Sequence, residues 1–208
     1  MNVDSVSFGA IPINKVVIKK WNKSVKQYTD YPVNFVKIDA YNKADLQALY
    51  KTSQKWKARK EAKYIQQIST SSQWMQENPI EVYALTLQRD KLENIQPSGI
   101  LGLAEMREEE AGQGIHLLNF LQVRPNAINV NQKYKVNYKY VGSGILTSLK
   151  KIYNKIYLFS ENDENIEKFY QKNGFTDDYK GSRHYTWDSN PFKRLLLKIR
   201  KFRLEKGI

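Results

Sequence analysis

The sequence predicts one α/β domain built around a mixed β-sheet. Its 208 residues, 41% of them hydrophobic, are enough for a single compact core. Apolar residues alternate with a period of two in some segments and recur at helical spacing in others. The resulting order, βααβββαβαβ followed by a last helix, contains no internal repeat and is typical of one mixed-sheet domain.

Composition excludes several kinds of chemistry. The chain has no cysteine, which rules out disulfides, a cysteine nucleophile and thiolate metal sites. Its two histidines, His116 and His184, are too few for a histidine-built metal centre. No stretch reaches the ~18 consecutive apolar residues of a membrane span, and the N-terminus lacks a secretion pattern, so we expect a cytoplasmic protein. Any catalysis must use carboxylates, hydroxyls, amides and backbone groups.

The net charge of +13 is unevenly distributed along the chain. An acidic segment, 76–130, lies between basic flanks. This pattern suits a protein that handles an anionic ligand and a cationic one, but ordinary solvated charge would produce it as well.

The N-terminal half is predicted to hold an arm, a strand and two helices. We expect residues 1–30 to form a loosely ordered basic arm that precedes a domain at 31–189. Within that domain, 32–38 reads as a strand, and Asn42 with Asp45 marks the start of a helix. A second helix has its apolar face within 58–75 and ends before a proline.

The C-terminal half is predicted to alternate strands and helices. The strand at 115–123 is nearly all apolar, so we expect it to be central and covered on both faces. Asn162 or Asp163 caps a helix that ends at Gly174. The other expected elements are strands at 80–89, 100–107, 155–159 and 183–187, a helix from Ile145 to Tyr153, and a basic helix at 192–206 within the tail 190–208.

Two glycines mark the start of the helix that follows strand 115–123. Gly142 and Gly144 lack a Cβ, so backbone amides there can approach a ligand closely. Unpaired N–H groups and the dipole at a helix N-terminus favour a pyrophosphate, and Lys139 adds a cation. The alternative is a glycine turn that packs the helix against the sheet.

A second motif, Tyr-Gln-Lys-Asn-Gly-Phe at 170–175, ends the next helix. Together the two motifs resemble those of the GNAT-type N-acetyltransferase superfamily, Arg/Gln-x-x-Gly-x-Gly/Ala followed by Tyr-x-x-x-Gly-Phe. The resemblance covers roughly residues 32–188. It implies a mostly antiparallel central sheet with helices on both faces, and acetyl-CoA as cosubstrate. The sequence departs from the family in Lys139, in the long span from Pro125 to Gly142, and in Asp163, where the family commonly has Asn.

The resemblance also implies residue roles. Tyr170 would donate a proton to the leaving thiolate, although it could equally be a core aromatic residue. The strand end Leu121–Val123 would splay from its neighbour and pair with pantetheine. The expected cofactor-binding residues are Leu121, Gln122, Val123, Lys139, Tyr140, Val141, Gly142, Ser143, Gly144, Ile145, Asn162 and Asn165.

Glu105 is the best-placed candidate for the general base, provided that it shares a strand face with Leu101 and Leu103. It could instead pair with a basic residue on a solvated face. His116 and Asn119 on the next strand are weaker candidates.

Two basic segments have several interpretations. The insert 126–138 interleaves lysines and tyrosines, which is typical of nucleic-acid contacts, of a cover over the adenosine 3′-phosphate or acceptor, or of a solvated loop. The helix at 192–206 carries an apolar stripe among basic residues. It could lie on an anionic membrane or RNA, but we favour docking onto its own domain through Phe192, Leu195, Ile199 and Phe202.

The function predicted from the sequence is acetyl-CoA-dependent N-acetyl transfer to a primary amine, by direct attack in a ternary complex. The alternative is a nucleic-acid- or ribosome-associated binding protein that has the fold without catalysis. The expected partners are acetyl-CoA and an amine acceptor, with a weak polyanion contact through the tail and a homodimer left open.

Overall fold

The computed structural model divides the chain into two compact units. Unit 1 comprises residues 1–105 and 121–145, and unit 2 comprises residues 106–120 and 146–208. The strands follow the order β6-β1-β2-β3-β4-β5-β7-β9-β8, with both antiparallel and parallel pairs, which confirms the predicted mixed α/β class. The structure describes residues 9–39, 42–56, 80–87, 92, 95–108, 116–124, 137–161, 163–177 and 182–206.

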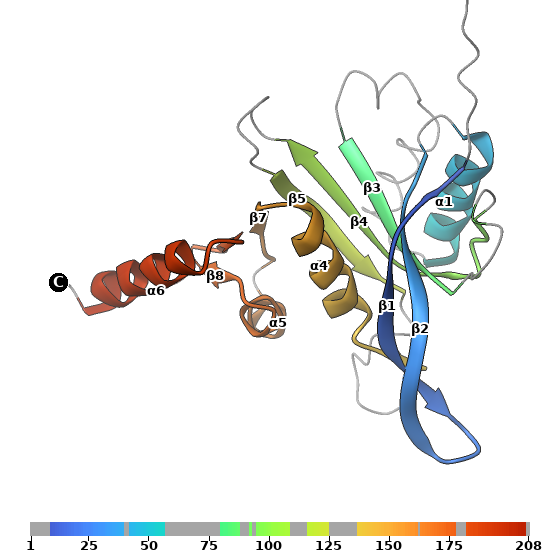
Figure 1. The fold of residues 1–208 in the computed structure, drawn as a ribbon, viewed down its shortest axis with the longest axis horizontal. Coiled ribbons are helices and arrows are strands. Elements are labelled where there is room, and N and C mark those ends of the chain that lie inside the picture. Colours follow the sequence, from blue (N-terminus) through green and yellow to red (C-terminus); the bar gives the residue numbers. More distant parts are fainter. Residues whose placement is uncertain are drawn as a thin grey trace, which may run out of the picture. The chain divides into compact units, whose positions relative to one another are not determined.

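Unit 1 begins with a long hairpin, β1 (Ile11–Asn22) and β2 (Gln27–Lys37), shown in blue in Figure 1. The two strands are antiparallel, and Trp21 meets Tyr28 edge-to-face at 5.1 Å between ring centroids. The prediction of a loose arm over 1–30 was therefore wrong for residues 11–30. β2 also pairs with β3 (Ile80–Thr86), a partner far along the chain that a local pattern does not reveal.

The most deeply buried strand is β4 (Ile100–Glu108), whose first seven residues are all buried. By contrast, β5 (His116–Val123) has one buried residue, Leu118. The expectation that the strand at 115–123 is covered on both faces was therefore wrong. Both strands are rich in apolar residues, so composition alone does not distinguish them. The elements that pack against each strand decide how much of it is buried.

Two helices belong wholly or partly to unit 1. Helix α1 (Lys43–Trp56) begins as predicted, since Asn42 Oδ1 accepts the N–H groups of Ala44 and Asp45 at 2.8 and 3.2 Å. Helix α4 (Val141–Ile152) follows the short strand β6 (Tyr138–Lys139), which pairs with β1. The helix expected within 58–75 and most of the insert 126–138 lie outside the described residues.

Unit 2 contains the end of β4, the first part of β5, the second part of α4 and the five elements β7, α5, β8, β9 and α6. β7 (Lys155–Phe159) pairs with β5 in parallel and with β9 (His184–Asp188) antiparallel. Helix α5 (Glu164–Lys172) is capped by the Asp163 carboxylate, and Gly174 ends it with a φ of +80°, both as predicted. The two-residue strand β8 (Thr176–Asp177) was not predicted.

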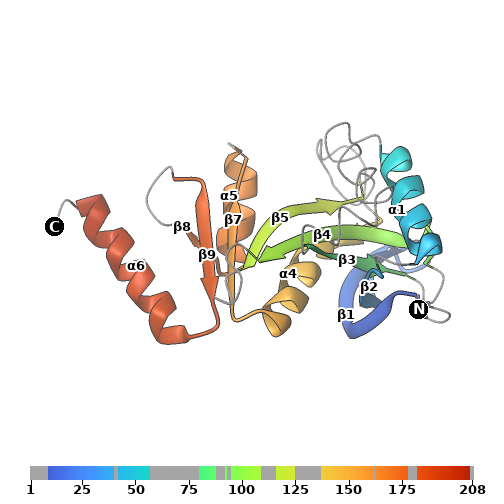
Figure 2. The same cartoon turned by 90° about the horizontal axis from the view of Figure 1, so that it is seen from above.

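The last helix, α6 (Pro191–Lys206), contacts β8 and β9 and lies next to them in Figure 2. Its Lys201 makes an ion pair with Asp177 of β8. The four apolar residues expected to dock are all exposed, with Phe192 at 66% and Ile199 at 42%. The preferred docking face was therefore wrong, because the helix uses another side for its contact with unit 2.

Candidate functional site

The N-terminus of α4 offers backbone donors to an anionic group. The Gly144 N–H donates to the Tyr140 carbonyl at 2.8 Å, which is the first bond of the helix. By helix geometry, the N–H groups of Val141, Gly142 and Ser143 precede that bond. Tyr140 is exposed and has a φ of +66°, a left-handed conformation that costs a non-glycine residue energy. Successive amides at such a turn form a concave anion site at the positive end of the helix dipole.

The two motif glycines have different surroundings. A Cβ built on Gly144 would lie 2.8 Å from Val16 Cγ1 and 3.6 Å from Ile18 Cγ2, so Gly144 faces β1. Gly102 of β4 likewise clears the way for α4, since a Cβ there would lie 2.6 Å from Ile145 Cδ1. The packing interpretation therefore explains Gly144, whereas the N–H groups that precede the first helical hydrogen bond belong to residues 141–143.

The pairing of β6 with β1 brings a second lysine close to Lys139. Because Val16 and Ile18 of β1 face α4, strand alternation places Lys19 on the opposite face of β1. Lys139 of β6 lies directly opposite Lys19 of β1 in the antiparallel register. The Lys139 ammonium sits 4.1 Å from the Tyr28 ring centroid, and Lys19 is 2.8 Å from the Asp30 carboxylate. Neither the strand at 11–22 nor the position of Lys19 was predicted, because 1–30 was expected to be an arm. The β-branched residues within 11–22 are the signal that could have indicated a strand.

Strand β5 continues beyond its pairing with β7. Among the described residues, the parallel register runs from His116 to Leu118, whereas β5 extends to Val123. The far end of β5 stays attached to β4, since the Arg124 N–H donates to the Leu101 carbonyl at 2.8 Å. The side-chain oxygen of Gln122 is buried and has no hydrogen-bond partner among the described residues. The strand end 121–123 thus fits an extended ligand that carries amide groups.

Tyr170 is 9% exposed and packs in an aromatic cluster of unit 2. Its ring lies 5.8 Å from that of Phe175 and 5.9 Å from that of Tyr185, between centroids. Burial, and secondarily the Glu161 carboxylate, raises the pKa of Tyr170 to about 12. The phenol therefore stays protonated at neutral pH and can act as a proton donor. The core-aromatic interpretation describes the same residue equally well.

Three further residues predicted for the site, Glu105, Asn165 and Asn162, have different surroundings. Glu105 is completely buried, so the alternative of a solvated face was wrong for it. Glu105 and Gly102 have opposite parity along β4, and strand alternation places Glu105 on the face away from α4. Asn165 is exposed, and its N–H donates to Asp163 Oδ1 at 2.7 Å. Asn162 lies outside the described residues.

His116 and Asn119 occupy the first half of β5, in unit 2. The His116 ring packs 4.3 Å from the ring of Tyr153, between centroids, whereas Asn119 is exposed. Both residues belong to unit 2, whereas Glu105 belongs to unit 1.

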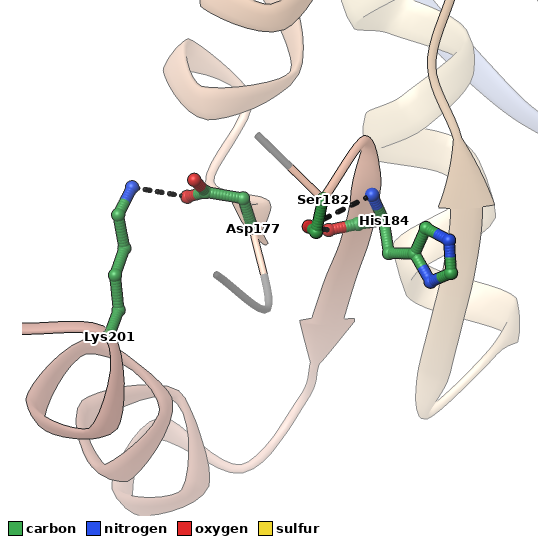
Figure 3. Close-up of polar contacts among 4 residues, drawn as sticks. All are labelled: Asp177, Ser182, His184 and Lys201. Atoms are coloured by element: carbon green, nitrogen blue, oxygen red, sulfur yellow. Dashed lines mark hydrogen bonds and ion pairs between the residues drawn. The ribbon is translucent and has the colours of Figure 1, made fainter. Parts of the chain in front are cut away.

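Ser182 and His184 do not form a nucleophile–base pair. The Ser182 hydroxyl donates to the His184 carbonyl, and the His184 backbone N–H donates to Ser182 Oγ at 3.2 Å. Figure 3 shows the imidazole pointing away from the serine. In the described part of the chain, no cluster of three or more His, Asp or Glu residues could hold a metal ion. No helix among the described elements is long and apolar enough to cross a membrane.

Several solved structures with a similar fold are described as acetyltransferases. One is an acetyltransferase from Exiguobacterium sp. 255-15, 15% identical, with a TM-score of 0.49 over 77% of this chain and 96% of that one. Another is a GNAT-family acetyltransferase from Desulfovibrio desulfuricans, 9% identical, with a TM-score of 0.46 over 85% and 100%. A third is RimL, the ribosomal L7/L12 α-N-protein acetyltransferase, in complex with coenzyme A, 10% identical, with a TM-score of 0.49 over 87% and 99%.

No protein-family model matches the sequence. A search of curated proteins likewise found no match. The similarity to the solved structures concerns the fold alone.

Proposed function

We propose that the protein is an acetyl-CoA-dependent N-acetyltransferase acting on a primary amine. The observation that carries this proposal is the N-terminus of α4, where the N–H groups of 141–143 precede the first helical hydrogen bond and Tyr140 adopts a left-handed turn. A pyrophosphate is a group that such a row of backbone amides at a helix N-terminus binds well. Support comes from β5, whose last residues run beyond the β7 register with a buried amide oxygen at Gln122.

The amide cradle and the strand end would hold two parts of the cosubstrate. The N–H groups of 141–143 bind the pyrophosphate, and backbone groups of 121–123 pair with the pantetheine amides. When bound, acetyl-CoA supplies an activated acetyl group as a thioester. The acceptor nitrogen attacks the carbonyl carbon, the C–S bond breaks, and Tyr170 gives its proton to the departing sulfur.

The proton lost by the amine goes to a base or to a water molecule. Glu105 is our candidate for this role. Because Glu105 is fully buried, it would accept the proton through a relay rather than by lying exposed to the acceptor. General-base help contributes on the order of 10²–10⁴-fold, so the proposed reaction does not depend on this assignment.

A screen of amine acceptors tests the proposal. Polyamines, aminoglycosides, amino acids and peptides are offered with acetyl-CoA, and release of free CoA thiol is followed. Tyr170→Phe should lower kcat about 10–100-fold and leave acetyl-CoA affinity unchanged, as the loss of a transition-state interaction does. Tyr157→Phe on β7 removes a hydroxyl outside the proposed site and serves as the control.

The second candidate function is polyanion binding without catalysis. The exposed basic face of α6 and the lysines of β1 favour it. If no acceptor releases thiol and acetyl-CoA leaves the melting temperature unchanged, while a polyanion raises it, the acetyltransferase proposal is wrong.

A further inference from the structure

Helix α6 is attached to unit 2 along one side only. The Lys201 ammonium pairs with the Asp177 carboxylate, and the Arg194 guanidinium lies 5.9 Å from the Trp187 ring centroid. Arg194 and Lys201 are seven residues apart, which is two helical turns, so they share one face. Figure 3 shows Lys201 reaching from α6 to Asp177.

A different face of α6 presents a continuous apolar stripe to solvent. Its members recur at helical spacing, and each is at least two-fifths exposed. They are Phe192 at 66%, Leu195 at 52%, Leu196 at 50%, Ile199 at 42% and Phe202 at 56%. Five large apolar side chains in one row form the kind of patch that marks an interaction site.

Cations surround this stripe. Five basic residues of α6 besides Arg194 and Lys201 are exposed: Lys193, Lys198, Arg200, Arg203 and Lys206. Its sequence contains one acidic residue, Glu205. The partner of this face must therefore be apolar in part and negatively charged, because an apolar neutral partner would leave the cations desolvated without compensation.

A cavity opens at the N-terminal end of the same helix. It has a volume of about 400 Å³ and is lined by Gly174, Pro191, Arg194, Leu195 and Lys198. Lys150 lies beside it, since a Cβ on Gly174 would be 3.7 Å from the Lys150 ammonium. Burial, and then the neighbouring Arg194, lowers the pKa of Lys150 to about 8. Two cations, Arg194 and Lys198, therefore line the cavity together with Leu195 of the stripe, and Lys150 lies beside them.

We propose that α6 binds the surface of an anionic lipid bilayer. The stripe enters the boundary between headgroups and acyl chains, the flanking cations meet the headgroups, and the cavity takes a lipid phosphate. This proposal does not rest on acetyl transfer, because every residue in it belongs to unit 2 and lies outside the α4 cradle.

Other occupants explain less of this face. RNA phosphates would neutralise the cations but would leave five large apolar side chains in water. A second copy of the chain would cover the apolar stripe but would bring two sets of cations together, with like charges opposed. An anionic bilayer satisfies the stripe and the charges at once.

Co-sedimentation of the full chain with vesicles tests the proposal. Vesicles of phosphatidylcholine and phosphatidylserine at 3:1 should bind the protein at least tenfold more tightly than phosphatidylcholine alone. Leu196→Gln/Ile199→Gln should reduce this binding at least tenfold, and Arg200→Gln/Arg203→Gln should do the same. The matched control, Lys151→Gln/Lys172→Gln, removes two exposed cations outside α6 and should bind like the wild type.

Four results would overturn the proposal. The first is that the protein does not bind phosphatidylserine vesicles, and the second is that the Leu196/Ile199 variant binds them as tightly as the wild type. The third is that inorganic phosphate at matched ionic strength releases the protein from vesicles, which would indicate a site for free phosphate. The fourth is a change from dimer to monomer in the Leu196/Ile199 variant, which would assign the stripe to a second copy. If the protein fails to bind vesicles, and the wild type and the Leu196/Ile199 variant bind an RNA oligonucleotide with equal affinity, the cations of α6 belong to a polyanion site instead. All six substituted side chains are exposed, four of them in α6 and the two control lysines outside it. We therefore expect every variant to keep the fold.

Discussion

Helices α4 and α6 have similar apolar periodicity but opposite environments. In α4 the residues Ile145, Leu146 and Leu149 have no exposed surface, whereas in α6 Leu195 and Leu196 are half exposed. Both helices were predicted from the spacing of their apolar residues. The comparison shows that periodicity indicates which face of a helix is apolar, and that the surrounding fold decides whether that face is covered.

The cause lies in the strands beside each helix. The start of α4 sits on a face of β1 and β4 that Gly102 and Gly144 keep free of side-chain bulk. α6 instead neighbours β9 and the two-residue strand β8, which ends the strand order. So short an edge offers too little surface to cover a helix of sixteen residues.

The largest expected difference between the two helices concerns a leucine-to-alanine pair. Leu149→Ala in α4 should lower the free energy of unfolding by about 2–5 kcal/mol, because it leaves a cavity in a packed core. Leu196→Ala in α6 should change it by less than about 0.5 kcal/mol. Urea denaturation of both variants measures the two values. Equal losses would contradict the contrast between the helices.

Features of the fold that depend on neighbouring residues were predicted better than features that depend on residues far apart in the sequence. The Asn42 and Asp163 caps and the Gly174 helix end depend on a few neighbouring residues, and all three were predicted. The pairing of β2 with β3 joins residues far apart in the sequence, such as Asn34 and Thr86, and was not predicted. Strand β8 was also missed, because its two residues are too few to form a pattern. Strand β4 is buried and β5 is mostly not, and this difference was not predicted because it depends on tertiary packing.

The candidate site follows the same division. The motif correctly indicated a helix beginning at the glycines, since α4 starts at Val141. It did not indicate that Gly144 faces Val16 or that Tyr140 adopts a left-handed conformation. Nor did it indicate that the pairing of β1 with β6 would place Lys19 opposite Lys139.

A second way to sharpen the contrast is to add one methyl group to α4. Gly144→Ala should destabilise the protein by about 1–3 kcal/mol, because the new Cβ would lie 2.8 Å from Val16 Cγ1 and force the helix off the sheet. Thr147→Ala, at an exposed position one turn further, is the control and should be nearly neutral. Thermal unfolding compares the two. A stable Gly144→Ala variant would mean that α4 lies less tightly on β1 than described.

A third prediction uses Lys150, the residue of α4 that lies beside α6. Burial and Arg194 lower its pKa to about 8, below its ordinary value of 10.5. Between these two pH values the folded protein binds fewer protons than the unfolded chain, so this group makes stability rise with pH there. Below pH 8 the cost of the buried charge is fully present.

Lys150→Met should remove that rise, which we expect to be on the order of 1–2 kcal/mol once solvent screening is included. The measurement is the free energy of unfolding at pH 7.5 and at pH 10 for both proteins. The same pH dependence in wild type and variant would show that another group titrates in this range.

The smallest predicted effect concerns the attachment of α6. Lys201→Gln leaves the Asp177 carboxylate, whose side chain is 10% exposed, without its ammonium partner, and should cost about 1 kcal/mol. Hydrogen exchange should then accelerate in α6 and remain unchanged in α4. Lys198→Gln, an exposed cation on the same helix, is the control. Unchanged exchange in α6 would mean that other contacts hold the helix in place.

The central claim is that the N-terminus of α4 binds acetyl-CoA, and calorimetric titration tests it most directly. Ser143→Asp places a carboxylate in the first turn, where the helix dipole tolerates it but a pyrophosphate would be repelled. Thr147→Asp adds the same charge one turn further along. We predict that acetyl-CoA binds the wild type and Thr147→Asp with similar affinity and binds Ser143→Asp at least tenfold more weakly. Equal affinity in all three proteins, or no binding by the wild type, would contradict the claim.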